Sequence, residues 1–440
     1  MIKKLLVANR AEIAVRVIRA CRDLGIKTVA VYSTADAQGM PVAMADEAVC
    51  IGEAPTDKSY LNVRNIITTA CALRCDAIHP GVGFLSENAD FAKQVEDAGL
   101  VFIGPRSETI ALLGNKVAAR QAALAAGIPI TPGSSEALVD LADAKKTAEH
   151  IGYPIILKAA AGGGGRGMRI VRKEEQLEQS LQLARKEALA FFGDASVHME
   201  RFLEQPRHVE IQLLADGQGG VVHLGERDCS VQRNHQKLLE ESPSPNLDEG
   251  LRKAMCHDSV RLFKELGYRG AGTVEFLVER DAYYFMEVNA RLQVEHPVSE
   301  LVSSLDLVQA QIKIAQGKKL PFKQKDIRIS GYALECRINA LSAGVITTLQ
   351  LPSGPFVRVD SHLEAGSILS PYYDSMVAKI IIWAPDRDQG IAVMLRALEE
   401  VNIQGITTNL DEQKRLIASK QFRGGRFTTD LYQKVCEQEK

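Results

Sequence analysis

The sequence has 440 residues, of which 46% are hydrophobic and 25% are charged, and its formal net charge at pH 7 is −2. Such a length corresponds to about three domains of ordinary size. The near-balance of charge gives no general attraction to nucleic acid or to anionic membranes, and no apolar run approaches the length of a membrane span. The eight cysteines show no zinc-binding spacing. Scattered thiols and a start without a signal peptide are typical of a cytoplasmic protein.

The N-terminal residues 1–114 are predicted to form one α/β domain. Strands over 4–8 and 28–32 flank an amphipathic helix over 11–24, which predicts a parallel sheet. A later helix is expected to be capped by Ser86, before a strand over 101–103. The polar face of the first helix carries Arg16, Arg19 and Asp23. These three most simply lie in solvent, and a subunit contact is the alternative.

Beyond this domain, helical periodicity predicts further helices from residue 107, over 116–126, 173–190 and 300–315. Strands are expected over 208–215 and 220–224, before the hairpin described below. Residues 331–440 predict a final piece of mixed strands and two helices, with Arg337 in a strand.

A glycine-rich loop lies between two apolar runs, 154–157 and 168–171. Lys158 ends the first run, and Gly164 and Gly165 belong to a row of four glycines. Bare backbone N–H groups suit a triphosphate, because glycine adds no side-chain bulk. The loop contains G-x-G-x-x-G, but a strand follows where a dinucleotide or P-loop site needs a helix. We predict a strand–loop–strand flap over phosphates within a small lobe at about 131–203; a flexible linker is the alternative.

A hairpin over 273–279 and 283–289 predicts a divalent-cation site. A three-residue turn would place Glu275 opposite Glu287, with Asn289 on the same face. Facing carboxylates repel, whereas Mg²⁺ prefers such oxygen ligands. The alternative is an exposed sheet face whose charges lie in water. The same turn predicts two further cross-strand pairs, Leu277 with Phe285 and Glu279 with Tyr283.

Two other polar stretches are candidates for anion binding. If extended, residues 291–295 place Arg291 and Glu295 on one face, where they would hold a small oxyanion and act as its base. On an open surface the same residues would form an ion pair worth under about 1 kcal/mol. Residues 226–237 are too polar for a core strand, and an extended chain would place His235 and Lys237 on one face. A solvated loop is the alternative there.

Together these residues resemble the biotin carboxylase family of the ATP-grasp superfamily, over essentially the whole chain. The segments that carry the resemblance are LLVANRAEIAVRVIRAC, IHPGVGFLSEN, KAAAGGGGRGM, ERDCSVQRNHQK, AGTVEFL, FMEVNARLQVEHP, ECRINA and SPYYDSM. The resemblance implies an α/β (α+β) ATP-grasp fold. Its parts would be an N-terminal parallel α/β domain at 1–114, an ATP-grasp domain at 115–330 with a mobile lid at about 131–203, and a mixed C-terminal domain at 331–440.

The resemblance also implies roles for particular residues. ATP would be bound by Lys116, Lys158, Gly164, Gly165, Glu200, Arg201, Phe202, Leu203, His208, Gln232 and His235. Mg²⁺ or Mn²⁺, at two sites, would be held by Glu275, Glu287 and Asn289. Bicarbonate would be held by Lys237, Arg291, the backbone of Val294 and Arg337. Glu295 would deprotonate bicarbonate, and Arg337 would also bind biotin. Arg16, Arg19 and Arg358 match positions around the family's dimer interface.

The implied reaction is the ATP-dependent carboxylation of biotin by bicarbonate, through carboxyphosphate, under a closed lid that excludes water. Biotin would be carried by a separate biotin carboxyl carrier protein, since the chain has no Met-Lys-Met attachment motif. A separate carboxyltransferase and a homodimer are expected. Acetyl-CoA, for malonyl-CoA and fatty acid synthesis, is the expected final acceptor; pyruvate and propionyl-CoA stay open. The rivals are another ATP-grasp ligase and an inactive nucleotide-binding scaffold.

Four positions depart from the family's usual pattern. Val82 stands in place of an aromatic residue, Asn115 in place of an Asp before Lys116, and Asn234 in place of an Arg before His235. The loop after Asn339 is shorter than usual. These departures bear on biotin placement and partner docking, and none removes a catalytic position.

Overall fold

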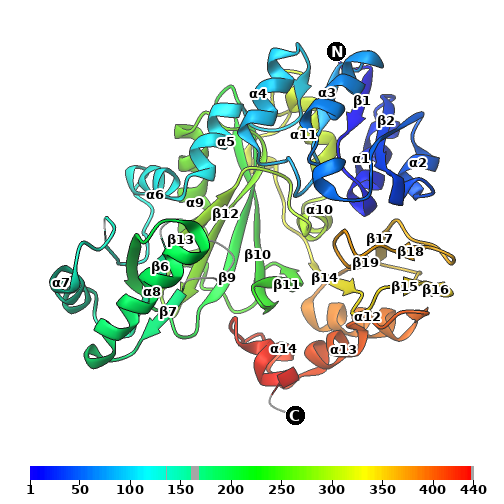
Figure 1. The fold of residues 1–440 in the computed structure, drawn as a ribbon. Coiled ribbons are helices and arrows are strands. Elements are labelled where there is room, and N and C mark those ends of the chain that lie inside the picture. The colour runs from blue at the N-terminus through cyan, green and yellow to red at the C-terminus, as the bar shows by residue number, and fades with distance from the viewer. Residues whose placement is uncertain (135, 160–167, 438–440) are drawn as a thin grey trace.

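The structure is a computed structural model that describes residues 1–134, 136–159 and 168–437 (Figure 1). Gly164 and Gly165 lie outside the described residues. The fold is mixed α/β and is built around two large sheets. Figure 1 shows the N-terminal part in blue, the lobe of α7, α8, β6 and β7 at the opposite side, and the C-terminal helices in red below. The strands of the larger sheet lie between these three parts.

The N-terminal sheet is parallel, as the sequence predicts, because apolar strands alternate with amphipathic helices. Its order is β3-β2-β1-β4-β5. The strands are β1 (Lys4–Val7), β2 (Lys27–Ser33), β3 (Glu47–Gly52), β4 (Ala77–His79) and β5 (Val101–Phe102), and the helices are α1 (Ala11–Asp23), α2 (Met40–Met44), α3 (Val63–Ala72) and α4 (Ala89–Asp97). Leu5, Leu6 and Val7 of β1 are fully buried, so the centre of this sheet is a continuous core.

Two expectations for this region are wrong. Ser86 does not cap α4: Asn88 does, by accepting a hydrogen bond from the backbone N–H of Phe91 at 2.7 Å. Arg16 does not lie in solvent with its neighbours on α1. It is 7% exposed and forms ion pairs with Glu300 at 2.8 Å and Asp306 at 2.7 Å. An amphipathic pattern cannot show that acidic residues from a distant segment cover the polar face.

The larger sheet has eight strands in the order β13-β12-β9-β10-β11-β14-β19-β17. They are β9 (Arg207–Asp216), β10 (Val221–Arg233), β11 (Gln236–Ser242), β12 (Arg269–Glu279), β13 (Ala282–Asn289), β14 (Tyr332–Asn339), β17 (Val357–Ser361) and β19 (Met376–Ala384). All neighbouring pairs are antiparallel. Strands from before and after residue 331 therefore share one sheet.

Strand β10 corrects the expectation that residues 226–237 are too polar for a core strand. Glu226, Arg227 and Asp228 are 2%, 0% and 1% exposed, respectively, and lie in the interior of the sheet. Each has a partner of opposite charge: Arg227 binds the fully buried Glu210 at 2.6 Å, and Glu226 and Asp228 bind partly buried arginines. Because paired charges can be buried where isolated ones cannot, polarity alone does not mark this segment as a loop.

The flap strands form as the glycine-rich sequence predicts. A three-stranded antiparallel sheet has the order β7-β6-β8. It consists of β6 (Ile155–Ala159), β7 (Met168–Val171) and β8 (Val197–Arg201), covered by α7 (Leu141–Ile151) and α8 (Leu177–Phe192). Leu157, Ala184 and Met199 belong to a separate hydrophobic core within this lobe. Lys158 pairs with Met168, so Lys158 lies at the end of the flap where the glycine loop begins.

The remaining helices connect these sheets. They are α5 (Ser107–Gly114), α6 (Lys116–Ala125), α9 (Glu249–Glu265), α10 (His296–Ser303), α11 (Leu307–Ala315), α12 (Arg387–Glu399), α13 (Leu410–Ala418) and α14 (Lys420–Arg423), and the short strands β15 (Gly344–Val345), β16 (Thr348–Gln350), β18 (Ile368–Leu369) and β20 (Asn402–Gln404) complete the C-terminal part. No helix within the described ranges is long and apolar enough to cross a lipid bilayer.

Helix counts differ from the expectation in two places. The single helix expected over 300–315 is two helices, because Ser304 is left-handed at φ 56° and Asp306 then caps α11. The C-terminal part has three α-helices where two were expected, since the four-residue α14 begins at the cap Ser419. A helix this short has too little periodicity to be detected in a sequence.

Candidate active site

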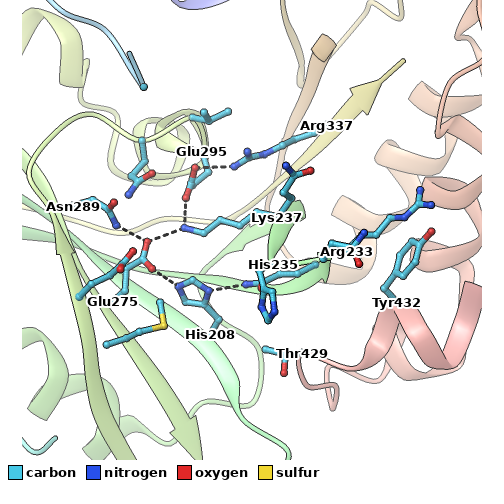
Figure 2. Close-up of a pocket in the computed structure, with 18 of the residues that line it drawn as sticks. His208, Arg233, His235, Lys237, Glu275, Asn289, Glu295, Arg337, Thr429 and Tyr432 are labelled. Atoms are coloured by element: carbon cyan, nitrogen blue, oxygen red, sulfur yellow. Dashed lines mark hydrogen bonds and ion pairs between the residues drawn. The ribbon is translucent and has the colours of Figure 1, made fainter. Parts of the chain in front are cut away.

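A cavity of about 1270 Å³ opens between the flap, the N-terminal domain, the large sheet and the C-terminal part. Every described candidate site residue lines it except Lys116. The lining candidates are Lys158, Glu200, Arg201, Phe202, Leu203, His208, Gln232, His235, Lys237, Glu275, Glu287, Asn289, Arg291, Val294, Glu295 and Arg337. Figure 2 shows strand residues from β9 to β14 converging on this space.

Lys237 on β11 is surrounded by carboxylates. Its Nζ donates to Glu210 at 2.8 Å, to Glu275 at 3.0 Å and to Glu295 at 2.6 Å. Burial alone would lower the pKa of Lys237, but the thiol of Cys229 and the three carboxylates hold it well above its ordinary value. Lys237 is therefore a fixed positive charge in the cavity wall (Figure 2).

Glu210 was missed by the sequence analysis. It is fully buried in β9 and links Lys237 to Arg227. The signal that would have found it is a charged residue inside the apolar run 209–215, since Glu is almost never fully buried without a partner.

The facing carboxylates of the hairpin are confirmed, although the predicted turn is not. The turn has two residues, and Glu279 pairs with Ala282 and Leu277 with Tyr284. The extra residue of a β-bulge then restores the pairing of Glu275 with Glu287. The predicted pairs Leu277 with Phe285 and Glu279 with Tyr283 are accordingly wrong.

These hairpin residues fit a divalent cation by their charge. Burial would raise the pKa of Glu275, but Lys237 and His208 outweigh it and hold this pKa well below the ordinary range. Burial raises the pKa of Glu287, Glu275 raises it further, and His208 and then Lys237 offset part of the rise. The two carboxylates thus repel each other across one face. A cation between them would relieve this. Asn289 lies on the same face, where its amide nitrogen donates to Glu275 at 2.8 Å and its oxygen accepts from Arg291, so the amide would have to turn to offer its oxygen to a cation.

Glu295 lies between two cations. It immediately precedes α10, is 1% exposed, and accepts from Lys237 at 2.6 Å and from Arg337 at 2.9 Å. Burial would raise its pKa, but Lys237 and then Arg337 hold it below the ordinary value. The side chain is therefore an ionised carboxylate that faces the cavity, which is the form a general base requires.

Arg291 does not share one extended face with Glu295, because residues 290–295 form no strand. Its Nε donates to Glu87 at 2.7 Å and its Nη2 to Asn289 at 3.0 Å. Glu87 comes from the N-terminal domain, and no local sequence pattern indicates this pairing. The backbone carbonyl of Val294 accepts from Lys379 at 2.8 Å.

Two cationic side chains, Lys158 and Arg120, bind Glu200 on the flap side of the cavity. Lys158 Nζ donates to Glu200 Oε2 at 2.5 Å, and Arg120 binds the other oxygen of Glu200 at 2.9 Å. His208 contacts Gln232 at 2.7 Å through Nδ1, and its Nε2 lies 2.8 Å from Glu275. The candidates that the sequence assigned to the nucleotide thus lie next to those assigned to the metal.

His235 is not extended with Lys237 as expected. It lies in the turn between β10 and β11, where Asn234 and His235 are left-handed at φ 51° and 63°. Both His235 and Lys237 still line the cavity. The aromatic residues Phe84, Tyr372 and Tyr373 line it too, together with Val82.

Comparison with known families identifies the class of protein. The model "Carbamoyl-phosphate synthase L chain, ATP binding domain" matches residues 115–323. The model "Biotin carboxylase, N-terminal domain" matches residues 1–110, and "Biotin carboxylase C-terminal domain" matches residues 335–434. With the strand–loop–strand flap and the facing carboxylates, these matches define an ATP-grasp ligase, as the sequence predicts.

Individual relatives narrow this class. The chain is 51% identical to the biotin carboxylase of Pseudomonas aeruginosa over 97% of both chains. It is 51% identical to biotin carboxylase 1 of Bacillus subtilis over 98% of both chains. The chain belongs to the biotin carboxylase family.

Solved structures agree with this assignment. A biotin carboxylase from Campylobacter jejuni, in a β,γ-ATP complex, matches with a TM-score of 0.94 at 44% identity over 99% of both chains. The biotin carboxylase domain dimer of Hydrogenobacter thermophilus 2-oxoglutarate carboxylase matches with a TM-score of 0.92 at 45% identity, over 99% of this chain and 97% of that one. That dimer holds MgADP, ADP and bicarbonate.

Proposed function

We propose that this protein is the biotin carboxylase component of a cytoplasmic acetyl-CoA carboxylase. It would use ATP and bicarbonate to carboxylate biotin on a separate carrier protein, and a carboxyltransferase would then pass the carboxyl group to acetyl-CoA. The observation that carries the proposal is Glu295, an ionised carboxylate held between Lys237 and Arg337 in the cavity. We also propose that the protein is a homodimer, and that each chain has three domains, at 1–114, 115–330 and 331–440.

The chemistry begins with bicarbonate, a poor electrophile that must be activated. Lys237, Arg291, the backbone of Val294 and Arg337 would hold it, and Glu295 would take its proton so that its oxygen attacks the γ-phosphate of ATP. Lys237 then neutralises charge that develops on the transferred phosphoryl group. ADP leaves, and carboxyphosphate then breaks down to CO₂ and phosphate beside biotin. The released phosphate would take the proton of the biotin ureido nitrogen, Arg337 would stabilise the resulting enolate, and the nitrogen would attack CO₂.

The nucleotide and its metal would occupy the flap side. Glu275, Glu287 and Asn289 would hold Mg²⁺ or Mn²⁺, which when bound neutralises phosphate charge. Residues assigned to ATP are Lys116, Lys158, Gly164, Gly165, Glu200, Arg201, Phe202, Leu203, His208, Gln232 and His235. Closure of the flap would exclude water from the carboxyphosphate intermediate.

The test is transfer of labelled bicarbonate. The purified protein is incubated with Mg·ATP, [¹⁴C]bicarbonate and either free biotin or a biotinylated carrier domain, and acid-labile label on biotin is counted. We expect label on biotin that depends on both ATP and Mg²⁺. ATP consumption without label on biotin would instead indicate another ATP-grasp ligase.

A second assay addresses the acceptor. Purified carboxyltransferases for acetyl-CoA, pyruvate and propionyl-CoA are added in turn with their carrier proteins. Label in malonyl-CoA supports the proposal. If label is transferred better to pyruvate or propionyl-CoA, the protein belongs to that class of carboxylase instead. The pyruvate alternative has a structural precedent: the biotin carboxylase subunit of a pyruvate carboxylase is 47% identical over 99% of both chains, with a TM-score of 0.88.

A further inference from the structure

Two buried glutamates face each other behind Arg337. Glu240 on β11 and Glu335 on β14 are direct partners in the antiparallel register, and both are fully buried. Side chains at such positions have Cβ atoms roughly 4.5–5.5 Å apart. Neither residue is among those that line the cavity within the described part of the chain. Any effect they have on the reaction must therefore act through a neighbour.

That neighbour is Arg337, two residues beyond Glu335 on β14. Arg337 Nη2 forms an ion pair with Glu240 and also donates to Glu295 at 2.9 Å. One guanidinium nitrogen thus connects the buried pair to the proposed base. Among the residues the structure describes, the oxygens of both Glu240 and Glu335 lack a hydrogen-bond donor of good geometry, and Glu335, unlike Glu240, has no ion pair.

The other charged groups near the pair are already engaged. Lys379 on β19 binds the carbonyl of Val294 at 2.8 Å and Glu12 at 3.3 Å, and it lies 3.8 Å from Asp360 on β17. Lys237 on β11 is bound to Glu210, Glu275 and Glu295. Within the described part of the chain, the two facing carboxyl groups therefore have one direct cationic partner, Arg337, and share it with Glu295.

Two buried carboxylates with one shared cation do not both stay ionised, because like charges at this distance repel in a medium of low dielectric constant. Burial raises the pKa of Glu335 well above its ordinary value, although Lys379 offsets part of the rise. Burial raises the pKa of Glu240 less far, because Arg337 opposes the rise, so Glu240 is the member of the pair that ionises first. The carboxyl group without an ion pair is the one that keeps a proton.

We propose that Glu335 is protonated and donates a hydrogen bond to ionised Glu240, which in turn holds Arg337 against Glu295. Glu240 and Glu335 are then positioning residues for the carboxylation, and this part rests on the proposed function. The proton prevents a second negative charge from forming behind Arg337. Its loss at alkaline pH would draw the guanidinium towards the pair and away from Glu295.

The experiment compares three variants that each convert a glutamate to glutamine. Glu335→Gln keeps a hydrogen-bond donor but cannot ionise, whereas Glu240→Gln removes the charge that binds Arg337. Glu241→Gln is the matched control, because Glu241 is the next residue on β11, is 1% exposed, and binds Tyr332 and Arg387 instead. Infrared difference spectroscopy and steady-state kinetics with free biotin are measured on each protein.

At neutral pH we expect the carbonyl stretch of a protonated carboxylic acid in wild type and in Glu241→Gln, and its loss in Glu335→Gln. Glu335→Gln should keep kcat/KM for biotin within about twofold at pH 7, and should lose less activity than wild type at alkaline pH. Glu240→Gln should lower kcat/KM for biotin about ten- to a hundredfold, the scale for one hydrogen bond to a charged group, with KM for ATP unchanged.

Three results would overturn the proposal: the acid band persists in Glu335→Gln, Glu335→Gln loses as much activity at pH 7 as Glu240→Gln, or Glu240→Gln keeps full activity. If Glu335→Gln does not fold, the acid band of wild type is titrated instead. Absence of that band at neutral pH would refute the protonation of Glu335. A wild type with no biotin-dependent turnover contradicts the proposed function alone, because the infrared band still tests the pair.

Discussion

Arg227→Met should destabilise the protein strongly, because it removes the partner of a fully buried charge. Arg227 on β10 is 0% exposed and donates to Glu210 at 2.6 Å, Gln212 at 2.7 Å and Ser299 at 2.8 Å. Removing one partner of a buried ion pair costs about 3–5 kcal/mol. Arg169→Met is the matched control: Arg169 binds Glu187 at 2.5 Å, but the two side chains are 33% and 36% exposed. An exposed pair is worth about 0–1 kcal/mol.

The pH dependence of this loss follows from Glu210. Burial would raise the pKa of Glu210, but Arg227 and then Lys237 hold it below its ordinary value. This ionised carboxylate therefore stabilises the fold above its unfolded-state pKa of about 4.3, and the stabilisation is lost as the pH falls through the lower folded-state pKa. Arg227→Met weakens that effect, so the deficit should be largest near pH 7, where Glu210 is ionised, and smaller at pH 4, below its unfolded-state pKa.

The assay is urea unfolding of wild type, both single variants and the double variant Arg227→Met/Glu210→Gln. We expect the double variant to be more stable than the sum of its single changes implies, because Glu210→Gln removes the charge that has lost one of its two cationic partners, Arg227 and Lys237. The reasoning fails if Arg227→Met costs no more than Arg169→Met, or if its deficit is equal at pH 4 and pH 7.

Three further predictions concern the cavity and the buried pair. Lys158→Met should raise KM for ATP about tenfold, as loss of one charge-assisted contact to phosphate would; an unchanged KM would remove Lys158 from the nucleotide site. Val82→Tyr should lower KM for free biotin several-fold, because the larger ring would bury more apolar surface against biotin, worth about 1 kcal/mol; an unchanged KM would mean that Val82 does not face biotin. Because the pKa of Glu335 is raised, folding takes up a proton there, and wild type loses stability as the pH rises above the unfolded-state value. The Tm of Glu335→Gln relative to wild type should therefore increase from pH 6 to pH 8.5, and a constant difference would contradict this.

Local patterns were enough to predict much of the fold. Apolar strands alternating with an amphipathic helix predict the parallel sheet, and the glycines between two short apolar runs predict the flap. The pairing of Glu275 with Glu287 was predicted even though the turn is one residue shorter than expected, because a β-bulge adds one residue to β13. Neither the turn length nor the bulge can be determined from the alternation of side chains alone.

What the sequence could not predict depends on contacts between distant segments. Glu226, Arg227 and Asp228 suggest a loop until their partners are known. Glu87 binds Arg291 from 204 residues away, and no local pattern links the two. Glu240 and Glu335 likewise meet through strand pairing. Buried charge networks are therefore the part of the site that only the three-dimensional structure shows.

The central claim is that Glu295 is the base that activates bicarbonate. Its most direct test is phosphate release from Mg·ATP and bicarbonate, with and without free biotin, in wild type and Glu295→Gln. We expect biotin to stimulate wild type, and the variant to lose the stimulated rate by about a hundredfold or more, the scale of general base catalysis. A Glu295→Gln variant that keeps the biotin-stimulated rate would contradict the account.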